Sequence, residues 1–270
     1  MLEVVIGLVG SLVIAGAAYM KRSLTLSGMV AAVILGTLMY AAGSLAWFGT
    51  LIAFFLSSTL LSKWKSRKKA ALESGYAKSG RRDAGQVLAN GGLGLVLCLG
   101  NAITPHPAWW AAFVGVMATV NADTWATEIG GLSRTLPRSI VSGRTVPAGT
   151  SGGITPLGFA ASCAGGLFIS AVAWALRAPA APGYASTAAA LALLGLAGGL
   201  AGSLADSWLG AVLQAMYRCQ VCGREIEKNR HCGTVAVSIR GAAFMTNDAV
   251  NMISSLIGGA VSLAITLAIY

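Results

Sequence analysis

The sequence predicts an all-α, polytopic bundle of transmembrane helices, and this prediction rests on composition and on the length of the apolar runs. Of the 270 residues, 56% are hydrophobic and 10% are charged, whereas about a quarter of the residues in a soluble domain are charged. Apolar runs of about 20 residues, enough to cross a hydrocarbon layer of roughly 30 Å as helices, recur along the chain. We therefore expect an integral membrane protein with a single transmembrane domain over residues 1–270.

About eight runs qualify as candidate spans. The first lacks the small-residue cleavage pattern of a removable signal, so we interpret it as a retained helix. The fifth run is short and the last two are long, so their ends are the least defined. In chain order the predicted spans cover 2–19, 25–42, 45–61, 84–103, 108–122, 154–176, 187–216 and 242–269.

The basic residues predict how these spans are oriented. With eight spans, every Lys and Arg except Arg177 falls in the loops after spans one, three, five and seven, including a basic loop at 62–83. Basic residues concentrate in cytoplasmic loops, so we expect a cell (inner) membrane protein with both termini outside and these loops in the cytoplasm. A basic inner surface facing anionic lipid headgroups explains the net charge of +10. A nucleic-acid partner is not expected, because no DNA- or RNA-binding module is present.

Four of the nine acidic residues lie in polar clusters at the inner ends of spans five, seven and eight. An isolated charge near the bilayer centre costs roughly 2.5 to 3.5 kcal/mol, so ionisable residues in spans indicate function. Of the other five, Asp83 begins the fourth span and is expected to cap it. The rest lie at chain ends or in polar loops and are given no role: Glu3, Glu73, Glu225 and Glu227. The four clustered acids are Asp123, Glu128, Asp206 and Asp248.

A short internal repeat strengthens this pattern. Residues 122–125 read Ala-Asp-Thr-Trp and residues 205–208 read Ala-Asp-Ser-Trp, each in the inner part of a span that runs in the same direction. The repeat predicts that two carboxylates are presented alike. Asn247 and Asn251 share a helix face beside the acid of the eighth span.

Carboxylates gathered in one place repel each other unless a cation lies among them. Carboxylate and amide oxygens are hard ligands that suit Mg²⁺, which takes one or two carboxylates together with substrate phosphates. The alternative is that each acid caps a helix or pairs with an arginine. The sequence thus predicts a magnesium site formed by Asp123, Glu128, Asp206 and Asp248.

The segment after the fifth span, within residues 121–153, is predicted to bind phosphate. From Arg138 it reads RSIVSGRTVPAGTSGGITPLG. Glycines let backbone N–H groups approach an anion, hydroxyls add donors, and the next helix presents its positive end. No Walker signature occurs, and a flexible Gly/Ser linker is the alternative. The candidate nucleotide- and phosphate-binding residues, together with the two asparagines, are Ser142, Gly143, Arg144, Thr145, Gly149, Thr150, Ser151, Gly152, Asn247 and Asn251.

The loop at 217–241 carries a third pattern, Cys219-x-x-Cys222 followed by His231 and Cys232. These residue types suit tetrahedral zinc, and a cytoplasmic location disfavours a disulfide. A redox-active pair is the alternative, but no thioredoxin-like pattern surrounds it. We expect a structural zinc ion that holds together a cytoplasmic loop too polar to fold by burial.

The motifs together resemble a known family. They are NADTWATEIGG, SGRTVPAGTSGGITPLG, GSLADSWLGAVLQ, the Cys-x-x-Cys with His-Cys, and TNDAVNMISSLIGG. In this order they resemble the integral membrane family whose plant plastid members are phytyl-phosphate kinases. The resemblance extends over nearly the whole chain and is dense over 121–259. More distantly, Asp123 with its following glycines and the loop at 145–151 resemble CTP-dependent lipid kinases such as dolichol kinase.

The resemblance implies transfer of a phosphate from a nucleoside triphosphate, with CTP favoured, to a prenyl monophosphate. In that reaction Asp123 and Asp248 would hold Mg²⁺ on the triphosphate, Asp206 and Glu128 would add ligands or supports, and Arg144 would stabilise developing charge. The prenyl tail would lie between spans or in the bilayer, beside glycine-rich faces such as 195–202, unless those glycines serve helix packing. Two other functions stay open: a secondary transporter of an anionic substrate, and a lipid-phosphate cytidylyltransferase. The sequence also leaves a homo-oligomer open.

Overall fold

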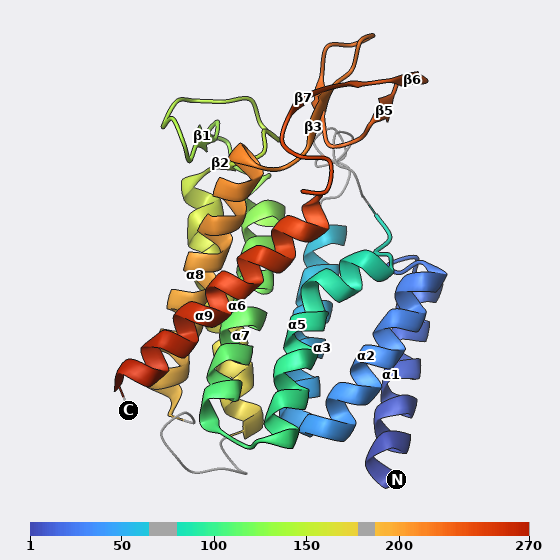
Figure 1. The fold of residues 1–270 in the computed structure, drawn as a ribbon, viewed down its shortest axis with the longest axis vertical. Helices are drawn as coiled ribbons and strands as arrows, with labels where there is room; N and C mark the ends of the chain where they lie inside the picture. The colour runs from blue at the N-terminus through green and yellow to red at the C-terminus, as the bar shows by residue number, and fades with distance from the viewer. Residues whose placement is uncertain (65–79, 178–186, 270) are drawn as a thin grey trace.

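The computed structural model describes residues 1–64, 80–177 and 187–269, and there it shows a bundle of long helices (Figure 1). The described part contains eight helices and seven short strands. Seven of the helices are long and apolar enough to cross a membrane. The prediction of an all-α polytopic bundle is confirmed, and the chain is an integral, multi-pass membrane protein.

The helices follow the predicted spans closely. The largest difference is at α6, which continues past the predicted end at residue 122, so that Asp123 and Glu128 lie on a helix. The polar second half of α6 lowers its mean hydropathy, and for this reason α6 is not among the seven helices that are apolar enough to cross a membrane. The eight helices are α1 (Leu2–Met20), α2 (Leu26–Gly43), α3 (Leu45–Lys63), α5 (Ala84–Ile103), α6 (Pro107–Gly130), α7 (Pro156–Arg177), α8 (Ala188–Val212) and α9 (Asn247–Ile269).

Both termini lie at one end of the bundle, and the segments that carry strands lie at the other (Figure 1). This placement agrees with an even number of crossings. We call the end that carries the strands the inner end. Its assignment to the cytoplasm stays a prediction from the basic residues, and most of the basic loop at 62–83 (residues 65–79) lies outside the described residues.

The strands are short and belong to the inner-end segments. β1 (Arg138–Ser139) pairs with β2 (Gly153–Ile154) and closes the segment between α6 and α7. Between α8 and α9, a three-stranded sheet and a small hairpin form a separate extension. Its strands are β3 (Met216–Arg218), β4 (Glu225–Ile226), β5 (Arg230–His231), β6 (Thr234–Val235) and β7 (Val237–Arg240), in the sheet order β4-β3-β7 with β5 pairing β6.

Side-chain caps explain where several helices begin. The Asp83 carboxylate accepts a hydrogen bond from the Gln86 backbone N–H at 2.9 Å, and the Gln86 side chain accepts one from the Asp83 N–H. This capping box starts α5 and confirms the predicted role of Asp83. Thr25 caps α2 and Thr187 caps α8 in the simpler way, with one side-chain acceptor each.

Helix α6 forms the centre of the bundle. Every residue from Trp110 to Ala122 is buried, and α6 packs against α7, α8 and α9. Trp110 and Phe113 join Trp47 of α3 in an aromatic cluster with ring centroids 4.4 to 5.3 Å apart. Such aromatic contacts add to the free energy gained from burying the rings.

Glycines set the distance between α6, α8 and α9. A Cβ on Gly198 of α8 would overlap the Ser262 hydroxyl and lie 2.7 Å from the Gly258 carbonyl oxygen of α9. The one hydroxyl proton of Thr119 in α6 is shared between the carbonyl oxygens of Gly115, at 2.9 Å, and of Gly198, at 3.1 Å. Small residues that let helix backbones approach are typical of packing in membranes. Of the two interpretations of the 195–202 stretch, helix packing is confirmed.

We expect Gly198→Ala to lower the free energy of unfolding by about 1 to 3 kcal/mol. The added methyl group would meet the backbones of α9 and α6, which cannot move aside as a flexible side chain could. Gly16→Ala in α1 is the matched control, since nothing lies within 4 Å of a Cβ there. Alanine is favoured over glycine in a helix by about 1 kcal/mol, so the control should hold or gain stability. Thermal unfolding in detergent measures both. Equal losses would contradict the packing argument.

Candidate functional site

A large polar cavity lies at the inner end of the bundle, with a volume of about 580 Å³. Side chains reach it from α3, α5, α6, α7, α8 and α9, from the turn between α1 and α2, and from both strand-bearing segments. Polar groups from most of the sequence thus converge on one level at the inner end of the bundle.

The two repeated aspartates line this cavity from neighbouring helices. Asp123 lies on α6 and Asp206 on α8, and the two carboxylates repel each other electrostatically. A serine accompanies each: Ser203 stabilises the charged form of Asp123, and the Ser254 hydroxyl donates to Asp206 Oδ2 at 3.1 Å. The structure therefore brings together the pair that the repeat predicts.

The other two predicted acids are placed differently. Glu128 lines the cavity but accepts a hydrogen bond from Ser62 and lies near Arg82. Within the described residues Asp248 falls outside the cavity lining, in the first turn of α9, where a negative charge favours a helix. Its neighbours Asn247 and Asn251 do line the cavity.

A magnesium ion fits the aspartate pair better than the full set of four acids. The four acids form no group of metal-binding geometry among the described residues. Mg²⁺ takes one or two protein carboxylates and completes its shell with water and phosphate oxygens. Asp123 and Asp206 supply two carboxylates. The binding of Mg²⁺, and a site formed by all four acids, stay predictions.

One half of the predicted phosphate loop lines the cavity, from Ala148 to Thr155. Gly152 adopts a left-handed φ of +78°, and a Cβ there would overlap Ala211 and lie 2.7 Å from the Ser207 carbonyl oxygen of α8. Only glycine lets the loop lie against the helix that carries Asp206. Gly149, Thr150, Ser151 and Gly152 are thus brought to the site, as predicted.

The other half, residues 142–145, forms an exposed turn away from the cavity. The Arg144 carbonyl oxygen accepts a hydrogen bond from the Ser139 N–H at 2.9 Å, and the Arg144 side chain is exposed. The structure does not bring Ser142, Gly143, Arg144 or Thr145 together with the aspartates. Their roles in binding phosphate, and that of Arg144 in catalysis, stay predictions.

Three basic residues at span ends line the cavity, although the sequence analysis used them only for orientation. They are Arg22, Lys63 and Arg82. Arg82 Nη1 donates to Thr59 Oγ1 at 3.2 Å, and burial lowers the pKa of Arg82 while the Glu128 carboxylate opposes that shift. Their position within a turn of predicted span ends, at the level of the aspartates, is the signal that could have indicated them.

Glu227 is another residue that the sequence analysis passed over. It follows β4 in the extension between α8 and α9, lines the cavity, and interacts electrostatically with Asp206. No local pattern marks this residue, because its position depends on how the extension folds back over the helices.

The same extension gathers the predicted zinc ligands. The ligand atoms of Cys219, Cys222, His231 and Cys232 all lie within 4.8 Å of one another. The backbone N–H of Cys222, then the His231 side chain, lower the pKa of Cys219 to about 6. Local desolvation within the cluster, followed by the neighbouring Cys222 and Cys219, raises the pKa of the otherwise exposed Cys232 to about 11. A left-handed φ of +50° at Cys232 lets it and His231 reach the same point. Three sulfur atoms and one imidazole suit tetrahedral zinc, although zinc binding itself stays a prediction.

Comparison with known proteins identifies the family to which this chain belongs. The family model of integral membrane protein DUF92 matches residues 9–259. Protein PGR of Arabidopsis thaliana is 31% identical over 264 residues, which is 92% of this chain and 90% of the relative. A membrane protein of Methanocaldococcus jannaschii is 28% identical over 82% of this chain and 84% of its own. Protein VTE6, chloroplastic, of Arabidopsis thaliana is 27% identical over 58% of this chain and 49% of its own. No solved structure matches.

We expect the purified full chain to contain one zinc ion per molecule, measured by inductively coupled plasma mass spectrometry. Cys222→Ser should lower that content to near zero, because a hydroxyl is a poor ligand for zinc. Cys163→Ser, in α7 and outside the cluster, is the matched control and should leave the zinc content unchanged. A chain free of zinc, or one whose zinc survives Cys222→Ser, would contradict the assignment.

Proposed function

Starting from the fact that this chain belongs to the DUF92 family of integral membrane proteins, we propose that it is a membrane kinase. It transfers a phosphate from a nucleoside triphosphate, with CTP favoured, to a prenyl monophosphate and forms a prenyl diphosphate. The observation that carries this proposal is the cavity at the inner end, where an aspartate pair, a glycine-rich loop and three basic side chains face one another. The preference for CTP and for a prenyl acceptor comes from the family resemblance.

The charges in the cavity suit two phosphate-bearing substrates. The loop from Ala148 to Thr155 offers backbone N–H groups and hydroxyls to the triphosphate. Arg22, Lys63 and Arg82 supply positive charge for the acceptor phosphate. Carboxylates alone would repel both substrates, so Asp123 and Asp206 make chemical sense as the residues that hold Mg²⁺. Bound there, the ion would neutralise charge on the triphosphate.

In the proposed reaction, an anionic oxygen of the acceptor phosphate forms a bond to the γ-phosphorus. The bond from that phosphorus to the oxygen bridging it to the β-phosphate breaks, and the nucleoside diphosphate leaves with the electron pair. No general base is needed, because the attacking oxygen is already ionised at neutral pH. The chain contributes by positioning and charge neutralisation, as phosphoryl transfer requires.

Amide side chains around the cavity are suited to holding the nucleotide. Asn247 and Asn251 on one face of α9 and Gln214 after α8 all line the cavity. An amide offers both a donor and an acceptor, which matches the edge of a nucleotide base. The Ser151 hydroxyl donates to Gln214 Oε1 at 3.3 Å and links the loop to this side of the cavity.

Asp123→Asn and Asp206→Asn should each lower kcat on the order of hundredfold, because a neutral amide holds a divalent cation poorly. Glu225→Gln is the matched control, since that carboxylate is exposed, pairs with Arg218 at 3.0 Å and lies outside the cavity. The assay supplies the purified protein with labelled CTP, ATP, GTP or UTP, magnesium and several prenyl monophosphates.

The products of that assay separate the proposal from its alternatives. A prenyl diphosphate and a nucleoside diphosphate support the kinase. Pyrophosphate with a cytidylylated lipid would establish the transferase instead, and substrate uptake into proteoliposomes without nucleotide would establish a transporter. A folded protein that makes no diphosphate from any combination would falsify the proposal.

Gly152→Ala should weaken nucleotide binding at least about tenfold, because the added methyl group pushes the loop off α8 and moves its N–H groups. Gly143→Ala is the matched control: it has a similar left-handed φ of +67° and nothing within 4 Å of a Cβ. Both variants share the backbone strain, so they differ only in contact with α8. The measurement is the rise in melting temperature with CTP and magnesium. If both variants lose equal protection, the exposed turn takes part in binding as the sequence analysis predicted.

A further inference from the structure

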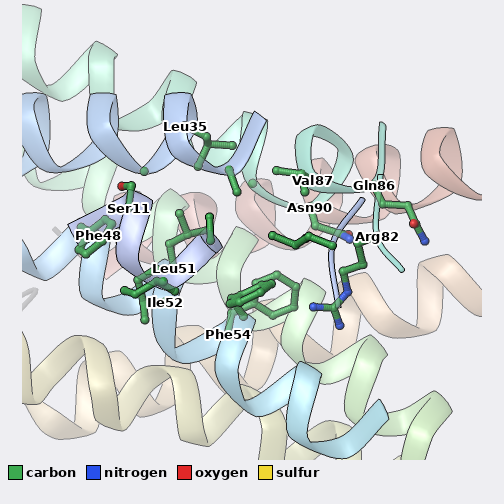
Figure 2. A pocket seen from close by; sticks show the side chains of 17 residues that line it. Ser11, Leu35, Phe48, Leu51, Ile52, Phe54, Arg82, Gln86, Val87 and Asn90 are labelled. Atoms are coloured by element: carbon green, nitrogen blue, oxygen red, sulfur yellow. The ribbon is translucent and has the colours of Figure 1, made fainter. Parts of the chain in front are cut away.

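A second pocket lies in the apolar part of the bundle, among α1, α2, α3 and α5 (Figure 2). Apart from Ser11 and three polar residues at one end, its walls are glycines and apolar side chains. They include Ala32 and Leu35 of α2, and Phe48, Leu51, Ile52, Phe54 and Phe55 of α3. Walls of this kind hold hydrocarbon in preference to water.

The apolar pocket and the polar cavity meet at three shared residues. Arg82, Gln86 and Asn90 line both. Figure 2 shows them gathered at one end of the apolar pocket, with Phe48 and Ser11 at the opposite end. The two spaces are therefore adjacent at these residues, and a polar space beside an apolar one matches a ligand with a charged head and a hydrocarbon tail.

The dimensions of the pocket favour a single narrow chain. It has a volume of about 60 Å³, against about 580 Å³ for the polar cavity. Along α3 it extends from Phe48 to Phe55, roughly 10 Å at 1.5 Å per residue. A space of this volume and length would take the first units of a linear chain.

Backbone hydrogen bonds fix Arg82 at the junction, whereas its side chain makes few hydrogen bonds. Its N–H donates to the Ser23 carbonyl oxygen at 2.9 Å, and its own carbonyl oxygen accepts from the Thr25 N–H at 3.0 Å. The guanidinium lies 5.7 Å from the centre of the Phe55 ring, a wall of the apolar pocket. Thr59 is its one side-chain hydrogen-bond partner in the described residues. Because a guanidinium carries five N–H donors, it can bind an anion in the cavity in addition to its contact with Thr59 and its attraction to the Glu128 carboxylate.

We propose that this pocket holds the tail of the lipid substrate, with the acceptor phosphate on Arg82 and the chain running between α2 and α3. The inference rests on the proposed function for the identity of the head group. It assigns the acceptor to the side of the cavity formed by α1, α3 and α5, and leaves the side formed by the glycine-rich loop to the nucleotide. It also makes the pocket the feature that selects tail length.

Photo-crosslinking of the wild-type protein tests the location directly and does not require catalysis. The probe is geranylgeranyl monophosphate with a diazirine on its second isoprene unit, and labelled peptides are identified by mass spectrometry. We expect labels on residues of α2 and α3 that line the pocket, displaced by unlabelled geranylgeranyl monophosphate and weakly by geranylgeraniol. Labels confined to the outer faces of α7 to α9, or displaced equally by the alcohol, would overturn the proposal.

Ala32→Phe tests the selection of tail length. The phenyl ring would fill the pocket part of the way along from Arg82. KM for geranylgeranyl monophosphate should therefore rise about tenfold, the effect expected if roughly two methylene groups of the tail are no longer buried. KM for dimethylallyl monophosphate, whose tail ends near Arg82, should stay within about twofold of wild type. Ala264→Phe, on the exposed face of α9, is the matched control and should change neither value.

The two experiments separate this inference from the proposed function. Labels in the pocket without diphosphate formation would refute the kinase and keep the lipid-phosphate site. Normal kinase activity with labels elsewhere, or with Ala32→Phe raising KM for both tails equally, would refute the tail pocket and keep the kinase.

Discussion

The close approach of α6, α8 and α9 is the constraint on which the rest of the molecule depends. Gly115, Gly198 and Gly258 leave no room for a Cβ between these helices. Because α6 and α8 run in the same direction at this short distance, residues at matching heights become neighbours. That geometry places Asp123 beside Asp206, and the electrostatic repulsion between them persists because the helices cannot move apart.

The membrane explains why the two signs of charge gather at one level. An ionised side chain is costly in the hydrocarbon core, so the acids of α6 and α8 and the basic residues at the ends of α1, α3 and α5 all lie at the inner end. There they face one another across a cavity. Away from that level, α1, α3 and α5 line an apolar pocket together with α2. The boundary between the two environments falls at Arg82. An amphipathic ligand bound there would place its charged head in the polar cavity and its hydrocarbon tail in the apolar pocket.

The sequence predicts the features that have a local cause. Apolar length gives the helices, the capping box at Asp83 gives the start of α5, and the repeated Ala-Asp-(Thr/Ser)-Trp gives the carboxylate pair. It failed at the end of α6, because a polar helical segment that lines a cavity resembles a loop in composition. The sequence analysis also did not identify Glu227 and Arg82 as residues of the site, because their positions depend on contacts between segments far apart in the chain.

The extension between α8 and α9 connects the predicted metal cluster to the cavity. The Ala215 N–H donates to the Met245 carbonyl oxygen at 2.9 Å, and Arg240 Nη2 donates to the Gly210 carbonyl oxygen at 3.1 Å, so both ends of the extension are fixed to the bundle. Glu227 lies between Cys222 and His231 in the chain. An ion that joins these two ligands would therefore limit how far Glu227 can move from Asp206. In this way a structural metal outside the cavity would help to set the charge inside it.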